Sequence, residues 1–112
     1  MKKFIVTYHA PHSFTEKMKN LSPEERKKGM DPWMAWAKKC GTGLVDWGTP
    51  LANAQIVNKK GSTQSKTDIV GYSVIQAETM EKAVEMLKEH PHLKWIDGCK
   101  IEIHESIPMQ SK

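Results

Sequence analysis

The stretch that decides the fold is IVGYSVIQAETMEKAVEMLKEHPHLKWIDGCKIEIHESI, residues 69–107. Its first part, Ile69–Ala77, is rich in β-branched side chains and predicts a strand. Thr79 then caps a helix whose apolar stripe consists of Met80, Ala83, Val84 and Leu87. The stretch therefore begins with a strand followed by an amphipathic helix.

The second half of the same stretch predicts another strand. Pro91 ends the helix, and Asp97-Gly98 forms a turn after Trp95. One face of the strand that follows carries Ile101, Ile103, Glu105 and Ile107, and the other carries Lys100, Glu102, His104 and Ser106. We expect the mixed polar row to point away from the helices.

The N-terminal part of the chain predicts a strand and a helix as well. Lys3–His9 is β-rich and alternates, and Ser22 with Glu25 forms a capping box around Pro23. Because proline lacks an N–H group, we expect this helix to kink or restart at Pro32. The stripe that faces the sheet is Trp33, Trp36, Ala37 and Cys40, and the helix ends at Gly41 and Gly43.

The middle of the chain predicts extended structure with one exposed loop. Leu44–Trp47 is a short strand, Gly48-Thr49-Pro50 forms a turn, and residues 52–58 continue as an extended segment. Residues 59–67 have almost nothing to bury and predict an exposed hairpin loop. Residues 109–112 form a tail.

The element order indicates an α+β domain of the ferredoxin-like plait type. The order β-α-β-β-α-β suits an antiparallel sheet with two helices on one face. The other face of the sheet then stays open, and monomers rarely leave such a face bare. We therefore expect a homodimer that pairs two sheets face to face.

Length and composition limit the other possibilities. The 112 residues suit a single domain, 1–112, and 38% hydrophobic residues can form its core. No stretch is long and apolar enough to span a membrane or to act as a secretory signal, so we expect a cytoplasmic protein. The two cysteines, Cys40 and Cys99, are expected to be free thiols.

The net charge of +4 raises the question of nucleic-acid binding. The lysines occur in separated pairs with acidic residues among them, whereas a nucleic-acid footprint needs clustered basic residues. Arg26 is the sole arginine, although arginine is the preferred side chain for reading base edges. We expect neither nucleic acid nor a membrane as a partner.

Five motifs spread over residues 3–108 resemble the YCII-related proteins of the dimeric α+β barrel superfamily. The motifs are Trp33-Met34-Ala35-Trp36, Gly48-Thr49-Pro50-Leu51, Gly71-Tyr72-Ser73-Val74, His90-Pro91-His92-Leu93 and Ile101-Glu102-Ile103-His104-Glu105. The resemblance implies a barrel-like dimer with a pocket near the first helix and the segment after the second helix.

The chain departs from this family at the residues to which catalysis is attributed. Some members pair a histidine in the first helix with an aspartate just before a proline after the second helix. Pro32 or Trp33 stands at the first of these positions and His90 at the second. The Asp-Gly-Pro-Phe motif of a sister group is also missing. The family's dyad therefore does not carry over to this chain.

The histidines are the remaining candidates for chemistry. His90 and His92 either stabilise the C-terminal end of a helix or act as general acid and base. As metal ligands they would need further partners such as His9 and His12, but the spacing matches no established zinc site, and we expect no metal or other cofactor. Glu102 and His104 lie about 7 Å apart along one strand, so we expect no direct hydrogen bond between them.

The tryptophans are read mainly as core residues, with a pocket as the alternative. Trp33 and Trp36 lie on the helix that the family resemblance places beside the pocket, and we name them with His9 as candidate ligand-pocket residues. Two functions remain open. One is a lyase or isomerase-type enzyme that uses His90 or His92 for proton transfer on an organic metabolite, and the other is a non-catalytic dimer that binds a small ligand or partner.

Overall fold

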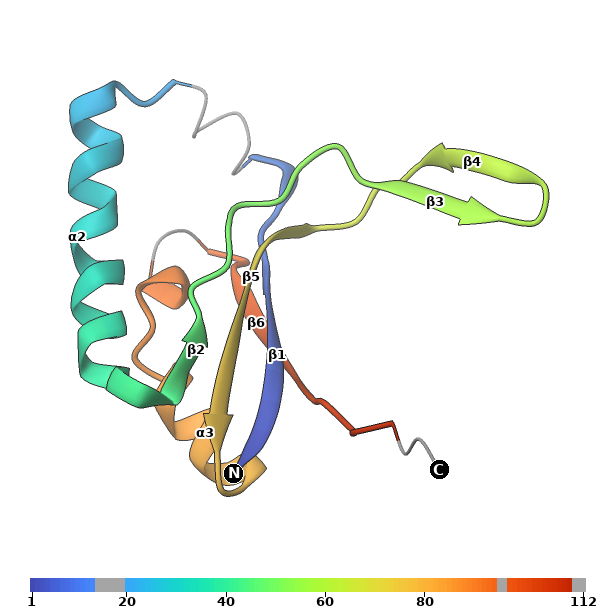
Figure 1. Ribbon diagram of the computed structural model, residues 1–112. Coiled ribbons are helices and arrows are strands. Elements are labelled where there is room, and N and C mark those ends of the chain that lie inside the picture. The colour runs from blue at the N-terminus through green and yellow to red at the C-terminus, as the bar shows by residue number, and fades with distance from the viewer. Residues whose placement is uncertain (14–19, 95–96, 110–112) are drawn as a thin grey trace.

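The computed structural model describes residues 1–13, 20–94 and 97–109, so Trp95 and residues 110–112 of the predicted tail lie outside the described residues. The described elements follow the chain in the order β1 Lys2–His9, α2 Pro23–Cys40, η1 Gly41–Gly43, β2 Leu44–Asp46, β3 Gln55–Asn58, β4 Gly61–Gln64, β5 Ile69–Ala77, α3 Met80–Leu87, η2 Pro91–Lys94 and β6 Lys100–Glu105. The chain is an α+β protein, with helices and an antiparallel sheet (Figure 1).

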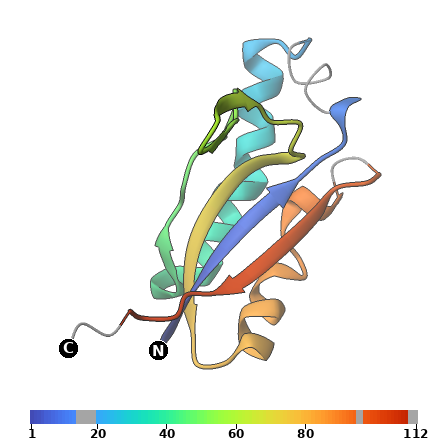
Figure 2. The same cartoon turned by 90° about the vertical axis from the view of Figure 1, so that its right-hand side faces the viewer.

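The main sheet has four antiparallel strands in the order β2-β5-β1-β6. Figure 2 shows α2 and α3 on the same side of this sheet, behind the strands. The opposite face is covered by neither helix, and we call it the open face. This arrangement is compatible with the predicted plait.

The alternation of β1 separates the core from the open face. Phe4, Val6 and Tyr8 are buried on the helix side, whereas Ile5 and Thr7 are more exposed on the open face. Ile101 and Ile103 of β6 pack against the same core, so the polar row of β6 points away from the helices as the sequence predicted. The core residues come from the sheet and from both helices.

Helix α2 continues through Pro32, so of the two predicted alternatives, a kink or a restart, the restart is wrong. The capping box of Ser22 and Glu25 holds its first turn, and Trp36 and Ala37 are buried in its second half. Trp36 donates its indole N–H to the carbonyl of Met86 at 2.8 Å, which joins α2 to α3. A proline inside a helix costs about 3 kcal/mol, and the packing of Trp36 and Ala37 after Pro32 helps to offset that cost.

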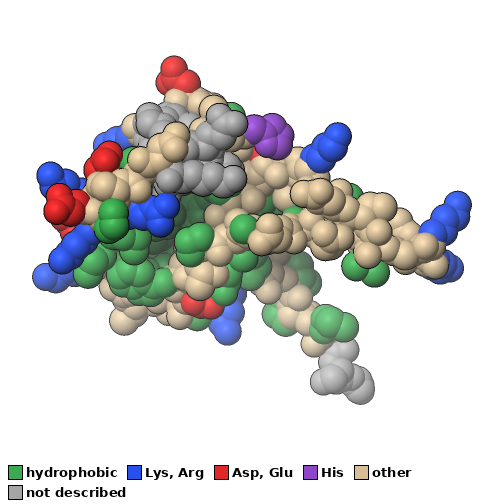
Figure 3. All heavy atoms as spheres, turned by 90° about the horizontal axis from the view of Figure 1, so that it is seen from above, with side chains coloured by type: hydrophobic (Ala, Val, Ile, Leu, Met, Phe, Trp, Pro, Cys, Tyr) green, Lys and Arg blue, Asp and Glu red, His purple; other side chains and the backbone are tan. Residues whose placement is uncertain are grey.

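The segment 59–67 forms part of an exposed hairpin, as predicted, but it contains a strand as well as a turn. Gly61–Gln64 is β4, which pairs with β3 through a turn at Lys59 and Lys60. All residues of both strands are exposed, and Figure 3 shows this hairpin projecting from the body with basic side chains at its end. Two strands can pair through backbone hydrogen bonds without burying any side chain. The polar composition of this segment therefore did not indicate a strand.

The turn between β2 and β3 lies directly against β5. Gly48 has a φ of 75°, and a Cβ atom at this position would lie 1.7 Å from the carbonyl oxygen of Tyr72. A glycine is therefore required for the chain to pass so close to the strand. The contact places Trp47 where its carbonyl accepts a hydrogen bond from Ser73 at 2.8 Å.

Candidate functional site

The histidines predicted as catalytic, His90 and His92, lie on the helix side of the sheet and are almost completely buried. His90 has 0% of its surface exposed and His92 has 1%. Three aromatic rings surround His90, with ring centroids 4.9 Å away at Tyr8, 4.3 Å at Trp33 and 4.4 Å at Trp36. The predicted pocket residue Trp33 therefore packs on His90 inside the core.

The protonation of His90 follows from its contacts. The backbone N–H of His92 donates to Nδ1 of His90 at 3.0 Å, so the proton of the neutral ring is on Nε2. Nε2 is buried and has no hydrogen-bond partner among residues 1–13, 20–94 and 97–109. Burial, with a smaller contribution from the charge of His92, lowers the pKa of His90 to about 3. The neutral ring acts as an aromatic member of the core.

His92 holds two strands together. Its Nε2–H donates to the backbone carbonyl of His9 at 2.8 Å, at the end of β1. Burial lowers the pKa of His92, while hydrogen bonds with the backbones of His9 and Lys100 oppose the lowering. The ring therefore joins η2 to the end of β1 and the start of β6.

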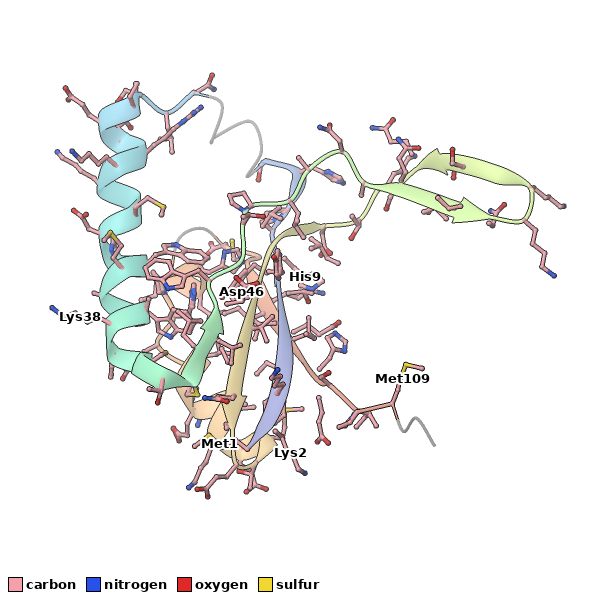
Figure 4. All side chains as sticks on the ribbon, in the orientation of Figure 1. Met1, Lys2, His9, Lys38, Asp46 and Met109 are labelled. Atoms are coloured by element: carbon pink, nitrogen blue, oxygen red, sulfur yellow. The ribbon has the colours of Figure 1, made fainter. Side chains whose placement is uncertain are left out.

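His9, which the sequence suggested as a pocket residue, lies on the open face and has 7% of its surface exposed. Figure 4 shows its side chain on the side of β1 away from α2. Its Nδ1 lies 2.6 Å from Oδ1 of Asp68, and its Nε2 lies 2.8 Å from Oγ1 of Thr7. We call these three residues the Thr7–His9–Asp68 cluster. The structure thus separates His9 from Trp33 and Trp36 by the thickness of the sheet.

The direction of each hydrogen bond in the cluster follows from the chemistry of its acceptor atoms. A carboxylate only accepts hydrogen bonds, so Nδ1 of His9 carries the proton that Asp68 accepts. In the neutral ring Nε2 is then the acceptor, and the hydroxyl of Thr7 donates to it. The hydrogen bond from His9 is the main cause of a lowered pKa for Asp68, with smaller contributions from the charges of His9 and Lys100.

Local structure brings Asp68 to His9. The backbone N–H of Ala10 donates to the carbonyl of Asp68 at 2.9 Å, just where the pairing of β1 with β5 shifts register after Tyr8. This irregularity places Asp68, which lies outside the strand, beside the ring of His9. Sequence reasoning missed Asp68 because 59 positions separate it from His9. Its location just before a predicted strand was the one available signal.

The structure also describes the His104–Glu102 pair and the two cysteines. His104 and Glu102 do form a direct hydrogen bond, 2.6 Å from Nε2 to Oε1, so the prediction of no bond is wrong. Both side chains are about half exposed and can bend toward each other along the strand, which backbone spacing alone does not capture. Cys40 and Cys99 are free thiols, as predicted.

Trp36 lines a shallow groove on the helix side. The groove lies between α2 and the segment α3–η2 and has a volume of about 460 Å³. Its wall is mainly apolar and its rim is charged, with lining residues that include Pro32, Trp36, Cys40, Met86, Pro91, Lys39 and Glu89. Lys39 and Glu89 form an ion pair of 2.9 Å at this rim.

The described residues contain neither a clustered metal site nor a membrane-spanning helix. Among residues 1–13, 20–94 and 97–109, no three side chains of the His, Cys, Asp or Glu type come together as a metal site. No helix in this described part is long and apolar enough to cross a membrane. The chain matches no known protein-family model and no protein of curated function.

Proposed function

We propose that this chain is a small enzyme of the lyase or isomerase type, in which His9 transfers a proton to and from an organic metabolite. The observation that carries the proposal is the 2.6 Å contact between Nδ1 of His9 and Asp68, with Thr7 at 2.8 Å on the other ring nitrogen. A histidine oriented by a carboxylate is the usual arrangement of a general base.

Each member of the Thr7–His9–Asp68 cluster has a distinct role in this proposal. Asp68 fixes the tautomer of His9 and stabilises the positive ring that forms when Nε2 takes up a proton. The hydroxyl of Thr7 relays a proton between a substrate on the open face and Nε2 of His9. It donates its own proton to Nε2 while its oxygen accepts a proton from the substrate. The substrate is then deprotonated and the ring becomes an imidazolium, which returns the proton at another atom.

The helix-side histidines are less suited to this role. The ring of His90 is enclosed by three aromatic side chains, and its pKa of about 3 makes it a weak base. The Nε2 atom of His92 is occupied by the carbonyl of His9. We therefore place the proton transfer at His9 and give His90 and His92 a structural role.

We also propose a cytoplasmic, YCII-like homodimer built on a ferredoxin-like plait. Sheet order β2-β5-β1-β6 with both helices on one face supports the plait. On β1, Ile5 is 37% exposed on the open face. Burying such apolar area against a second copy is favourable at about 25 cal/mol per Å². Such pairing would also enclose the Thr7–His9–Asp68 cluster.

A second candidate function is non-catalytic binding of a small ligand. The groove beside Trp36 favours it, because its wall is apolar and a ligand there would contact an indole ring. In that case a ligand would change the fluorescence of Trp36 and be recovered unaltered. Recovery of a changed compound would instead support the enzyme.

Exchange of hydrogen for deuterium tests the enzyme without knowledge of the product. A panel of small oxo acids, hydroxy acids and lactones is incubated with the protein in D₂O, and loss of C–H signals is followed by NMR. We expect catalysed exchange with at least one compound class, and about a hundredfold slower exchange for His9→Gln. His104→Gln is the matched control on the same face. Equal exchange by wild type and His9→Gln would refute the proposal.

A further inference from the structure

A lysine lies directly beside the proposed base on the open face. Lys100 is the residue of β6 that pairs with His9 of β1. Directly opposed residues of antiparallel strands project from the same face with Cβ atoms about 5 Å apart. The ammonium group of Lys100 therefore shares a surface with the Thr7–His9–Asp68 cluster.

Among the residues that the structure describes, the charge of Lys100 is only weakly engaged. Its Nζ lies 4.0 Å from Oδ2 of Asp68, at the outer limit of an ion pair, and 65% of its side chain is exposed. Asp68 directs its other oxygen, Oδ1, to His9 at the much shorter distance of 2.6 Å. The next acidic residue on the strand, Glu102, is bound to His104 at 2.6 Å. Lys100 can thus turn toward a ligand without breaking a short contact.

We infer that the site takes an anionic substrate, and that an oxygen of its carboxylate or phosphate group binds Lys100 beside Thr7 and His9. This inference rests on the proposed function and adds the substrate class to it. Lys100 is a flexible point charge, so it binds one oxyanion oxygen and does not require the flat, two-pronged geometry that arginine recognises. A neutral amide of the same shape has no such attraction.

Charge balance gives the anion a role in the chemistry as well. Before the reaction, Lys100 carries a positive charge and Asp68 a negative one. The anion adds one negative charge, and proton transfer to His9 then places one positive charge on the ring and a second negative charge on the substrate. Lys100 and the imidazolium together offset the two negative charges of the deprotonated substrate, which favours removal of the proton.

The test uses acetate, inorganic phosphate and neutral acetamide as probes of the whole protein. The imidazole resonances of His9 are followed by long-range ¹H–¹⁵N NMR at constant pH and ionic strength. We expect saturable shifts with acetate or phosphate and none with acetamide, and the two anions distinguish a carboxylate from a phosphate site. Lys100→Gln should weaken the anion about five- to tenfold, while Lys100→Arg should retain most of the affinity.

The control is Lys94→Gln, which removes an exposed lysine on the helix side and should leave the anion affinity unchanged. A weak, non-saturating response that is the same in wild type and Lys100→Gln would overturn the inference. Its failure is distinct from failure of the proposed function. If anions do not bind but His9→Gln abolishes exchange, the anion inference is wrong, and the chain is an enzyme that acts on a neutral substrate. If anions bind but His9→Gln exchanges at the wild-type rate, the proposed acid–base role of His9 is wrong.

Discussion

The imidazole of His92 donates to the backbone carbonyl of His9 at 2.8 Å, while the side chain of His9 points to the other face of the sheet. One histidine therefore holds the backbone that presents the other. This relationship divides the histidines into a structural group, His90 and His92, and a candidate base, His9. The two groups predict different effects of substitution.

Replacing His92 should reduce stability. His92→Leu has a similar size but leaves the carbonyl of His9 without its donor, and a buried unsatisfied polar group costs about 1–3 kcal/mol. Urea unfolding followed by circular dichroism measures the change. His12→Leu, at an exposed position, should change the free energy of unfolding by less than about 0.5 kcal/mol. Equal effects of the two substitutions would contradict the structural role of His92.

The protein should lose stability in mild acid because of His90. The folded-state pKa of about 3 lies below the value of about 6.5 in the unfolded chain, so the unfolded state binds more protons between these values. Stability is therefore complete above about pH 6.5 and falls as the pH decreases toward 3. From pH 7.5 to pH 5 we expect a loss of about 2 kcal/mol from this group.

The test of the acid effect compares wild type with His90→Phe. The groups that face His90 are the rings of Tyr8, Trp33, Trp36 and His92. His92 also has a lowered pKa and acts in the same direction. His90→Phe should therefore be less stable at neutral pH but show a flatter dependence on pH. An unchanged slope would show that His90 accepts a proton in the folded state.

Asp68 should act as a positioning residue for His9. Asp68→Asn keeps the size of the side chain but loses the charge that orients the ring, so we expect deuterium exchange to slow about tenfold or more. Asp97→Asn, in the turn before β6, is the matched control and should exchange normally. A change in the pH profile of exchange for Asp68→Asn would distinguish orientation of the ring from a general loss of fold.

A charge on the open face should separate the proposed dimer. Ile5 lies in the middle of β1 and is 37% exposed, so Ile5→Lys would place an ammonium group in the paired layer. Light scattering should give twice the mass of one chain for wild type and a single chain for Ile5→Lys. Met34→Lys, on α2, tests the same change on the helix side and should remain dimeric. A wild-type monomer would refute the dimer.

Local patterns were sufficient to predict most of the fold. The capping box at Ser22 and the alternation of β6 depend on neighbours within a few residues, and both are present in the structure. Of the predicted α3 stripe, Ala83 and Leu87 are buried, whereas Met80 and Val84 are 37% and 38% exposed. Pro32 led to the wrong prediction of a helix restart. Proline locally disfavours a continuous helix, but the packing of Trp36 outweighs this preference. The hairpin strand β4 was missed because its residues bury nothing.

The candidate site was much harder to predict. The motif His90-Pro91-His92 is conspicuous in the sequence, but its burial depends on aromatic rings contributed by β1 and α2. The contact of His9 with Asp68 depends on a register shift between β1 and β5 that no local pattern reveals. Tertiary contacts therefore determine which histidine is a candidate base.

The role of His9 is tested by comparing His9→Gln, His90→Phe and His92→Leu in the deuterium exchange assay, with rates expressed per folded protein. We expect His9→Gln to slow exchange about a hundredfold, while the two other variants keep nearly the wild-type rate in their folded fraction. Normal exchange by His9→Gln together with loss in His90→Phe or His92→Leu would contradict this role and place the chemistry on the helix side of the sheet.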